Sequence, residues 1–148
     1  MGVDTTDGAA AGERMHQIGE VAEAVGLSLR TIRYYEEAGL VLASGRSTGG
    51  FRLYTAADID RLRLVKHMKP LELTIEEMRD LLATRDQLAD ATTSEHDRST
   101  LLDRLSMFAE LAEERCQRLR DHVDAAESIS RTLRAELDAA APVVHPSR

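Results

Sequence analysis

Residues 18–40 read IGEVAEAVGLSLRTIRYYEEAGL, a pattern of apolar and turn residues typical of two short helices. Apolar side chains recur at helical spacing at the start, which predicts a first helix over about residues 19–25. Gly26 stands where a left-handed turn residue is needed, and Ser28 is a good N-cap for a second helix that ends at Gly39. Two helices joined by a short turn that contains glycine form a helix-turn-helix.

The second helix has one face that is unlike a protein core, because the residues that share it by helical spacing are Arg30, Arg33, Tyr34 and Glu37. Ile32 and Tyr35 point the other way and are expected to pack inside. The guanidinium fork of arginine matches guanine edges and phosphate oxygens, and a tyrosine hydroxyl can donate to phosphate. This face therefore predicts contact with DNA, against the alternative of a solvated helix surface.

The next stretch, VLASGRSTGGFRLYT, predicts a small hairpin after the second helix. Its glycines mark turns, and residues 51–54, FRLY, alternate apolar and polar side chains as a short strand does. A hairpin in this place is a wing. Arg46, Arg52 and Tyr54 would offer it further donors to phosphate.

Two further helices are expected to brace the helix-turn-helix. Thr55 with Asp58, and Thr74 with Glu77, have the spacing of capping boxes, and Pro70 separates the two helical patterns.

From Ser94 to about Ala140 the chain has no Gly or Pro. This predicts one helix on the order of 65–70 Å long. Its apolar residues recur at steps of three and four or their sums, as in a heptad seam, and such a stripe needs a partner, most simply a second copy of the chain. The expected interface residues are Leu101, Leu105, Phe108, Ala112, Leu119, Ala126, Ile129 and Leu133.

The formal net charge of the 148-residue chain is −7, but the charge is unevenly spread. Residues 14–69 carry nine Lys and Arg against six Asp and Glu, whereas residues 70–148 carry ten against seventeen. The helix-turn-helix segment is thus the basic part, as expected for a footprint on nucleic acid. With no apolar run long enough to cross a bilayer and no signal-peptide pattern at the start, a cytoplasmic location is expected.

In order, spacing and residue type, roughly residues 17–84 strongly resemble the MerR family of bacterial transcription regulators. The motifs that carry the resemblance are IGEVAEAVGLSLRTIRYYEEAGLV, GRSTGGFRLYTAADIDRLRLVKHMKPL and TIEEMRDLL. The resemblance implies a mainly α protein with a winged helix-turn-helix domain and an antiparallel dimerisation helix. It implies that Arg33 and Tyr34 of the recognition helix, and Arg46, Arg52 and Tyr54 of the wing, contact DNA, while Arg30 matches a position that is often basic or polar.

The expected organisation is a disordered lead over 1–14, the DNA-binding domain over 15–85, the coiled-coil helix over 94–141 and a flexible tail over 142–148. The expected function is that of a homodimer that binds a palindromic promoter and distorts its spacer so that RNA polymerase can engage. Two alternatives are an effector-free regulator controlled by its abundance and a coiled-coil interaction protein anchored on DNA.

Several features bear on effectors and cofactors. Soft-metal sensors of this family use several cysteines, whereas this chain has only Cys116, and its histidines lack ligand spacing, so no metal or cofactor is expected. Cys116 is expected to be a packed residue, with a thiol sensor as the alternative. A small-molecule effector stays open. The sequence contains no catalytic motif, so the protein is not expected to be an enzyme. In the family a glycine commonly stands where this chain has Glu72, so the turn before the second brace helix is expected to differ.

Overall fold

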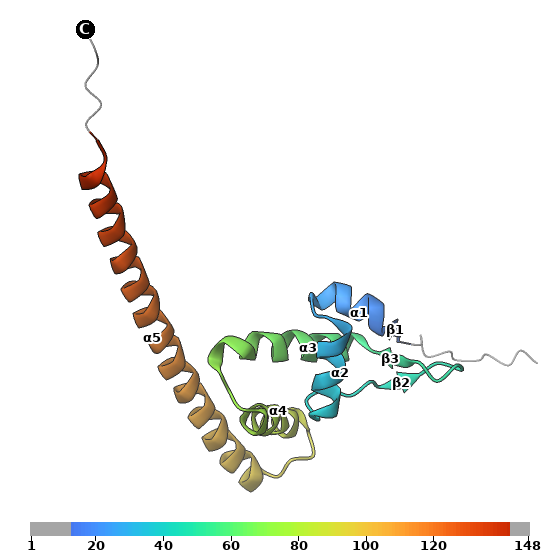
Figure 1. Ribbon diagram of the computed structural model, residues 1–148. Coiled ribbons are helices and arrows are strands. Elements are labelled where there is room, and N and C mark those ends of the chain that lie inside the picture. The colour runs from blue at the N-terminus through green and yellow to red at the C-terminus, as the bar shows by residue number, and fades with distance from the viewer. Residues whose placement is uncertain (1–12, 143–148) are drawn as a thin grey trace, which may run out of the picture. The chain divides into compact units, whose positions relative to one another are not determined.

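The computed structural model describes residues 13–142 (Figure 1). The chain forms two compact units that meet between Thr92 and Thr93. The lead expected over residues 1–14 and the tail expected over 142–148 fall almost wholly outside the described residues. Among residues 13–142, none of the helices combines the length and the apolar composition that a membrane span requires.

The first unit combines helices with a small sheet. Its elements are β1 (His16–Gln17), α1 (Ile18–Val25), α2 (Leu29–Glu37), β2 (Gly45–Arg46), β3 (Arg52–Tyr54), α3 (Ala56–Met68), a 3₁₀ turn (Lys69–Leu71) and α4 (Ile75–Ala89). The buried side chains that form its core come from α1, α2, α3 and α4, from β3 and from the segment that follows α2: Val21, Val25, Ile32, Tyr35, Leu40, Val41, Tyr54, Ile59, Leu62, Val65, Met68, Met78 and Leu82. The second unit contains α5 (Glu95–Ala140).

The helix-turn-helix forms as its local signals predict. Gly26 adopts the left-handed conformation, with φ +66°, and its N–H closes α1 on the carbonyl of Ala22 at 2.9 Å. The Ser28 hydroxyl accepts the backbone N–H of Thr31 at 3.1 Å, so it caps α2 as expected. These two devices turn the chain sharply and start the second helix within a few residues.

The wing is a three-stranded antiparallel sheet in the order β1-β3-β2. The central strand β3 pairs on one side with β1, Tyr54 opposite His16, and on the other with β2, Arg52 opposite Arg46. The hairpin tip is closed by Gly50, whose φ of +79° suits glycine. Strand β1 was not expected from the sequence, because two residues carry no periodic signal of their own.

Helices α3 and α4 begin with the predicted capping boxes at Thr55 and Thr74. They also close the carboxyl ends of the helix-turn-helix. Lys66 Nζ donates to the carbonyl of Val25 at 2.7 Å, and Arg79 Nη2 donates to the carbonyl of Ala38 at 2.8 Å. Because cations suit the negative end of a helix, these contacts fix α1 and α2 on their braces.

The turn between α3 and α4 keeps a glycine-like backbone although the residue there is glutamate. Glu72 has φ +52°, the only positive φ of a non-glycine residue among those described. A side chain in this region carries a steric cost that glycine would avoid.

The long helix of the second unit is the one predicted. α5 runs for 46 residues, and the Ser94 side chain caps it by accepting the N–H of Asp97 at 3.1 Å.

Candidate nucleic-acid interface

Helix α2 presents the polar face that its spacing predicts. Arg30, Arg33, Tyr34 and Glu37 are all exposed, while Ile32 and Tyr35 are buried. The tyrosine pair therefore divides as expected. Tyr34 has 52% of its surface exposed, and its ring lies 5.8 Å from that of Tyr35 at a tilt of 49°. This contact places the exposed ring of Tyr34 against an aromatic residue of the core.

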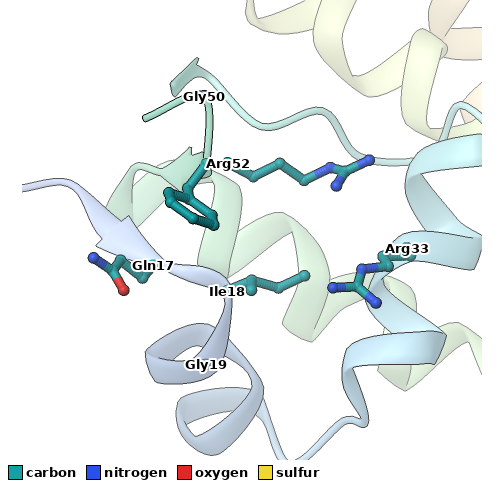
Figure 2. A pocket seen from close by; sticks show the side chains of 7 residues that line it. Gln17, Ile18, Gly19, Arg33, Gly50 and Arg52 are labelled. Atoms are coloured by element: carbon teal, nitrogen blue, oxygen red, sulfur yellow. The ribbon is translucent and has the colours of Figure 1, made fainter. Parts of the chain in front are cut away.

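A hollow of about 150 Å³ joins this face to the wing (Figure 2). Helix α2 supplies Arg33 to it, and the hairpin supplies Gly50, Phe51 and Arg52. The start of α1 closes the hollow with a short segment, residues 17–19. The structure thus brings together two of the sequence-predicted arginines, Arg33 and Arg52, from elements about twenty residues apart.

The start of α1 adds backbone donors to this hollow. Gln17 occupies the N-cap position without a capping hydrogen bond from its side chain, so the first N–H groups of the helix have no side-chain partner there. Apart from its chain neighbours and the backbone of its own helix, no atom lies within 4 Å of where a Cβ of Gly19 would stand, so a ligand can approach the backbone closely. Helix N-termini favour anions.

The two wing arginines have different surroundings. Arg46 is exposed, and its Nη1 donates to the carbonyl of Gly50 at 3.0 Å, which ties the side chain to the hairpin tip. Arg52 lies with its Nε 2.7 Å from Glu36 Oε2, an ion pair between β3 and α2. Arg46 and Arg52 both keep further N–H groups that could donate hydrogen bonds to a phosphate.

The expectation that Tyr54 contacts DNA is wrong. Its side chain is fully buried, and its hydroxyl donates to Glu36 Oε1 at 3.0 Å. Burial, and next the hydrogen bond to the Glu36 carboxylate, raise the pKa of Tyr54 well above its usual range. A ring inside the core whose hydroxyl is already engaged offers nothing to a phosphate.

Phe51 is the exposed aromatic that sequence reasoning missed. It is 71% exposed at the hairpin tip and lines the same hollow as Arg33 and Arg52. The alternation in FRLY separates Phe51 and Leu53 from Arg52 and Tyr54 on the two faces of a strand, but it does not say which face the core covers. An apolar residue directly after two glycines in a hairpin is the signal that could have identified it.

The predicted interface residues of α5 fall into three groups by their exposure. Leu119, Ala126, Ile129 and Leu133 are exposed, and Val123 and Leu137 extend the same apolar stripe. Leu105, Phe108 and Ala112 are half-buried in the single chain. Leu101 is 5% exposed, and its place in the dimer interface stays a prediction.

Comparison with known proteins identifies the relatives of this chain. The model of the MerR HTH family of regulatory proteins matches residues 17–85, the helix-turn-helix, the wing and both braces. The HTH-type transcriptional regulator ZntR of Escherichia coli K12 is 31% identical over 133 residues, which span 90% of this chain and 86% of that protein.

Two solved structures share the fold. A MerR-family transcriptional regulator from Bacillus thuringiensis superposes with a TM-score of 0.63 at 20% identity, over 82% of this chain and 99% of the other. HiNmlR, a MerR family regulator lacking the sensor domain and bound to promoter DNA, superposes with a TM-score of 0.55 at 20% identity, over 82% of this chain and 94% of that one. Because the helix-turn-helix, the wing and the long helix occur here in one chain that also matches ZntR over most of its length, the protein belongs to the MerR family of transcription regulators.

Proposed function

We propose that the protein binds double-stranded promoter DNA as a homodimer, with α2 in the major groove and the wing on the flanking backbone. The observation that carries this proposal is the hollow in which Arg33 of α2 meets Phe51 and Arg52 of the wing. It makes the recognition helix and the wing one continuous surface, so a single duplex can touch both.

On the recognition helix the residues divide by chemistry. Arg33 is the candidate for a base edge or a phosphate, and Tyr34 for a phosphate beside it. Arg30 extends the basic face of α2 at its amino end.

The wing and the start of α1 supply the remaining contacts of this surface. Arg46 and Arg52 reach phosphates from the wing, and Phe51 packs on sugar without any hydrogen bond. The start of α1 can receive one more phosphate on its backbone N–H groups.

Homodimerisation is proposed through α5. Its exposed stripe of leucine, isoleucine and valine side chains repeats at coiled-coil spacing over residues 119–137. Antiparallel pairing of two copies provides two equivalent basic surfaces, and a two-fold protein reads a palindromic site.

The dimer is further proposed to distort the promoter spacer so that RNA polymerase can engage. Because promoter DNA and RNA polymerase of a bacterium lie in the cytoplasm, the protein is proposed to act there. Smooth bending of a site of this size costs on the order of 1–6 kcal/mol, so several phosphate contacts per subunit are needed to offset it. The wing and recognition-helix candidates named above supply that number.

Replacement of one arginine at a time tests the DNA surface. Arg33→Ala should weaken binding to the protein's own promoter by roughly 1–3 kcal/mol, about 5- to 150-fold, if it reads a base edge. Arg85→Ala is the matched control, since Arg85 is an exposed arginine of α4 away from this surface. Fluorescence anisotropy on labelled promoter DNA measures both. Equal affinities of the two variants would remove Arg33 from the interface.

Promoter geometry tests the distortion separately. A regulator that works by distortion should lose activation, or repress, when the spacer is cut to the standard length. In-vitro transcription from matched long-spacer and standard-spacer promoters measures this. Activation that is unaffected by spacer length, with no bend in circular-permutation gels, would leave DNA binding in place but reject the distortion.

A further inference from the structure

Glu36 connects the recognition helix to the wing through one carboxylate. Its Oε1 accepts the hydroxyl of Tyr54 at 3.0 Å, and its Oε2 lies 2.7 Å from Arg52 Nε. Tyr54 and Arg52 both belong to β3, where alternate side chains share a face of the strand. A residue of α2 thus contacts two neighbouring side chains on that face of the central strand.

The surroundings of this carboxylate make its position costly to disturb. The Glu36 side chain is only 10% exposed. Its Oε2 accepts no hydrogen bond within the described residues, so the short contact with Arg52 is an ion pair whose N–H bond is not directed at the oxygen. A carboxylate in such a place depends on its neighbouring cation, and removal of either partner leaves the other poorly compensated.

The ion pair with Glu36 anchors Arg52 but leaves the end of its guanidinium group available. The contact is made at Nε, and the side chain remains 38% exposed and lines the hollow that it shares with Arg33. The Nη groups of the guanidinium are therefore available while its stem is anchored. An anchored arginine loses less conformational entropy when it binds a phosphate than one that samples solvent freely.

We infer that Glu36 is a positioning residue for DNA binding: it holds Arg52 and the wing strand at a set place relative to the recognition helix. This rests on the proposed function, since it specifies how the two parts of that surface are kept together. The acidic residue accordingly strengthens DNA binding, although a carboxylate beside a phosphate backbone would by charge alone weaken it.

The next residue provides the contrast. Glu37 is exposed on the same helix and forms no ion pair among the described residues. Its charge repels the negatively charged phosphate backbone. Two adjacent glutamates, identical in charge and neighbours on one helix, should therefore affect DNA affinity in opposite directions.

The experiment compares Glu36→Gln with Glu37→Gln in the full-length protein on its own promoter DNA, over a range of salt concentrations. Both substitutions preserve shape and remove one negative charge. Glu36→Gln should weaken binding about 10-fold, whereas Glu37→Gln, which removes a negative charge from the face turned to the DNA, should tighten it. The slope of log K against log salt should fall in Glu36→Gln by about 0.9 for each phosphate that the protein no longer neutralises, one per subunit. A purely structural role would lower the melting temperature without changing that slope.

Glu36→Asp and Arg52→Gln complete the design. Glu36→Asp keeps the charge but withdraws the carboxylate by one methylene, so it should also lower the DNA affinity and the slope of log K against log salt. It replaces Glu36→Gln as the test variant if Glu36→Gln fails to fold. In the Arg52→Gln background, a further Glu36→Gln change should cost no additional affinity. The inference is overturned if the Arg33 and Arg52 variants bind weakly but folded Glu36→Gln and Glu36→Asp bind as well as the wild type or more tightly. If those arginine variants bind normally, it is the proposed function that fails.

Discussion

Substitution of Leu133 by glutamate should separate the proposed dimer into monomers. Leu133 lies on α5 with 57% of its surface exposed in the single chain. Full burial of a leucine contributes about 1.5–3 kcal/mol, so covering the exposed half contributes about 1–1.5 kcal/mol per chain. A symmetric dimer contains the residue twice, which makes about 2–3 kcal/mol, or about 30- to 150-fold in the dimer Kd. The buried carboxylate adds to this loss.

Ala135→Glu is the matched control. Position 135 is two residues further along and about 200° around the helix, so it faces away from the stripe. It is exposed, and the substitution adds the same charge to the same part of α5.

Sedimentation equilibrium from nanomolar to high micromolar concentration measures the dimer Kd of both variants, with circular dichroism to confirm that the helix persists. Leu133→Glu should weaken the dimer at least about 30-fold, as worked out above, and Ala135→Glu by less than about twofold. Promoter binding should disappear together with the dimer. Equal dissociation constants for the two variants, or a wild-type chain that stays monomeric at high micromolar concentration, would refute the reasoning.

Three other predictions follow from local contacts, and a fourth follows from the composition of the chain. Arg79→Ala, which removes the donation to the Ala38 carbonyl, should lower the free energy of unfolding by about 1 kcal/mol in urea titrations, whereas Arg79→Lys should have a smaller effect. Folding raises the pKa of Tyr54, so as the pH rises the unfolded chain loses the phenol proton before the folded chain does. The stability that this provides is fully present below pH about 10, and the free energy of unfolding should fall above pH about 10 by up to about 1.4 kcal/mol per pH unit. Tyr54→Phe, compared in alkaline denaturation curves, should lack that part of the decline. Glu72→Gly should raise the melting temperature by relieving a left-handed side chain, a gain of about 0.5 kcal/mol after the entropy of glycine is deducted, and a lower melting temperature would contradict this. Elemental analysis of untagged protein should find no stoichiometric zinc or copper, since Cys116 is the chain's single thiol, and one ion per chain would disprove this.

Features carried by neighbours in the chain could be predicted from the sequence. A cap involves residues three apart, so Ser28, Thr55 and Thr74 indicated the starts of their helices. Helical periodicity likewise separated the exposed Tyr34 from the buried Tyr35. The same local logic identified α5, where the absence of Gly and Pro continues over 46 residues.

Features that depend on packing between distant segments required the tertiary structure. Alternation along β3 separates two faces but does not say which one is covered, so the sequence assigned the buried Tyr54 to DNA and gave no role to the exposed Phe51. Strand β1 exists because β3 pairs with it, and its own two residues favour no structure. The link from Glu36 to Arg52 and Tyr54 joins residues 16 and 18 positions apart, and only the approach of α2 to the wing brings its charges together. Local interactions act within one turn or one strand and can therefore be predicted from the sequence, whereas burial and ion pairing are decided by which surfaces meet when the chain folds.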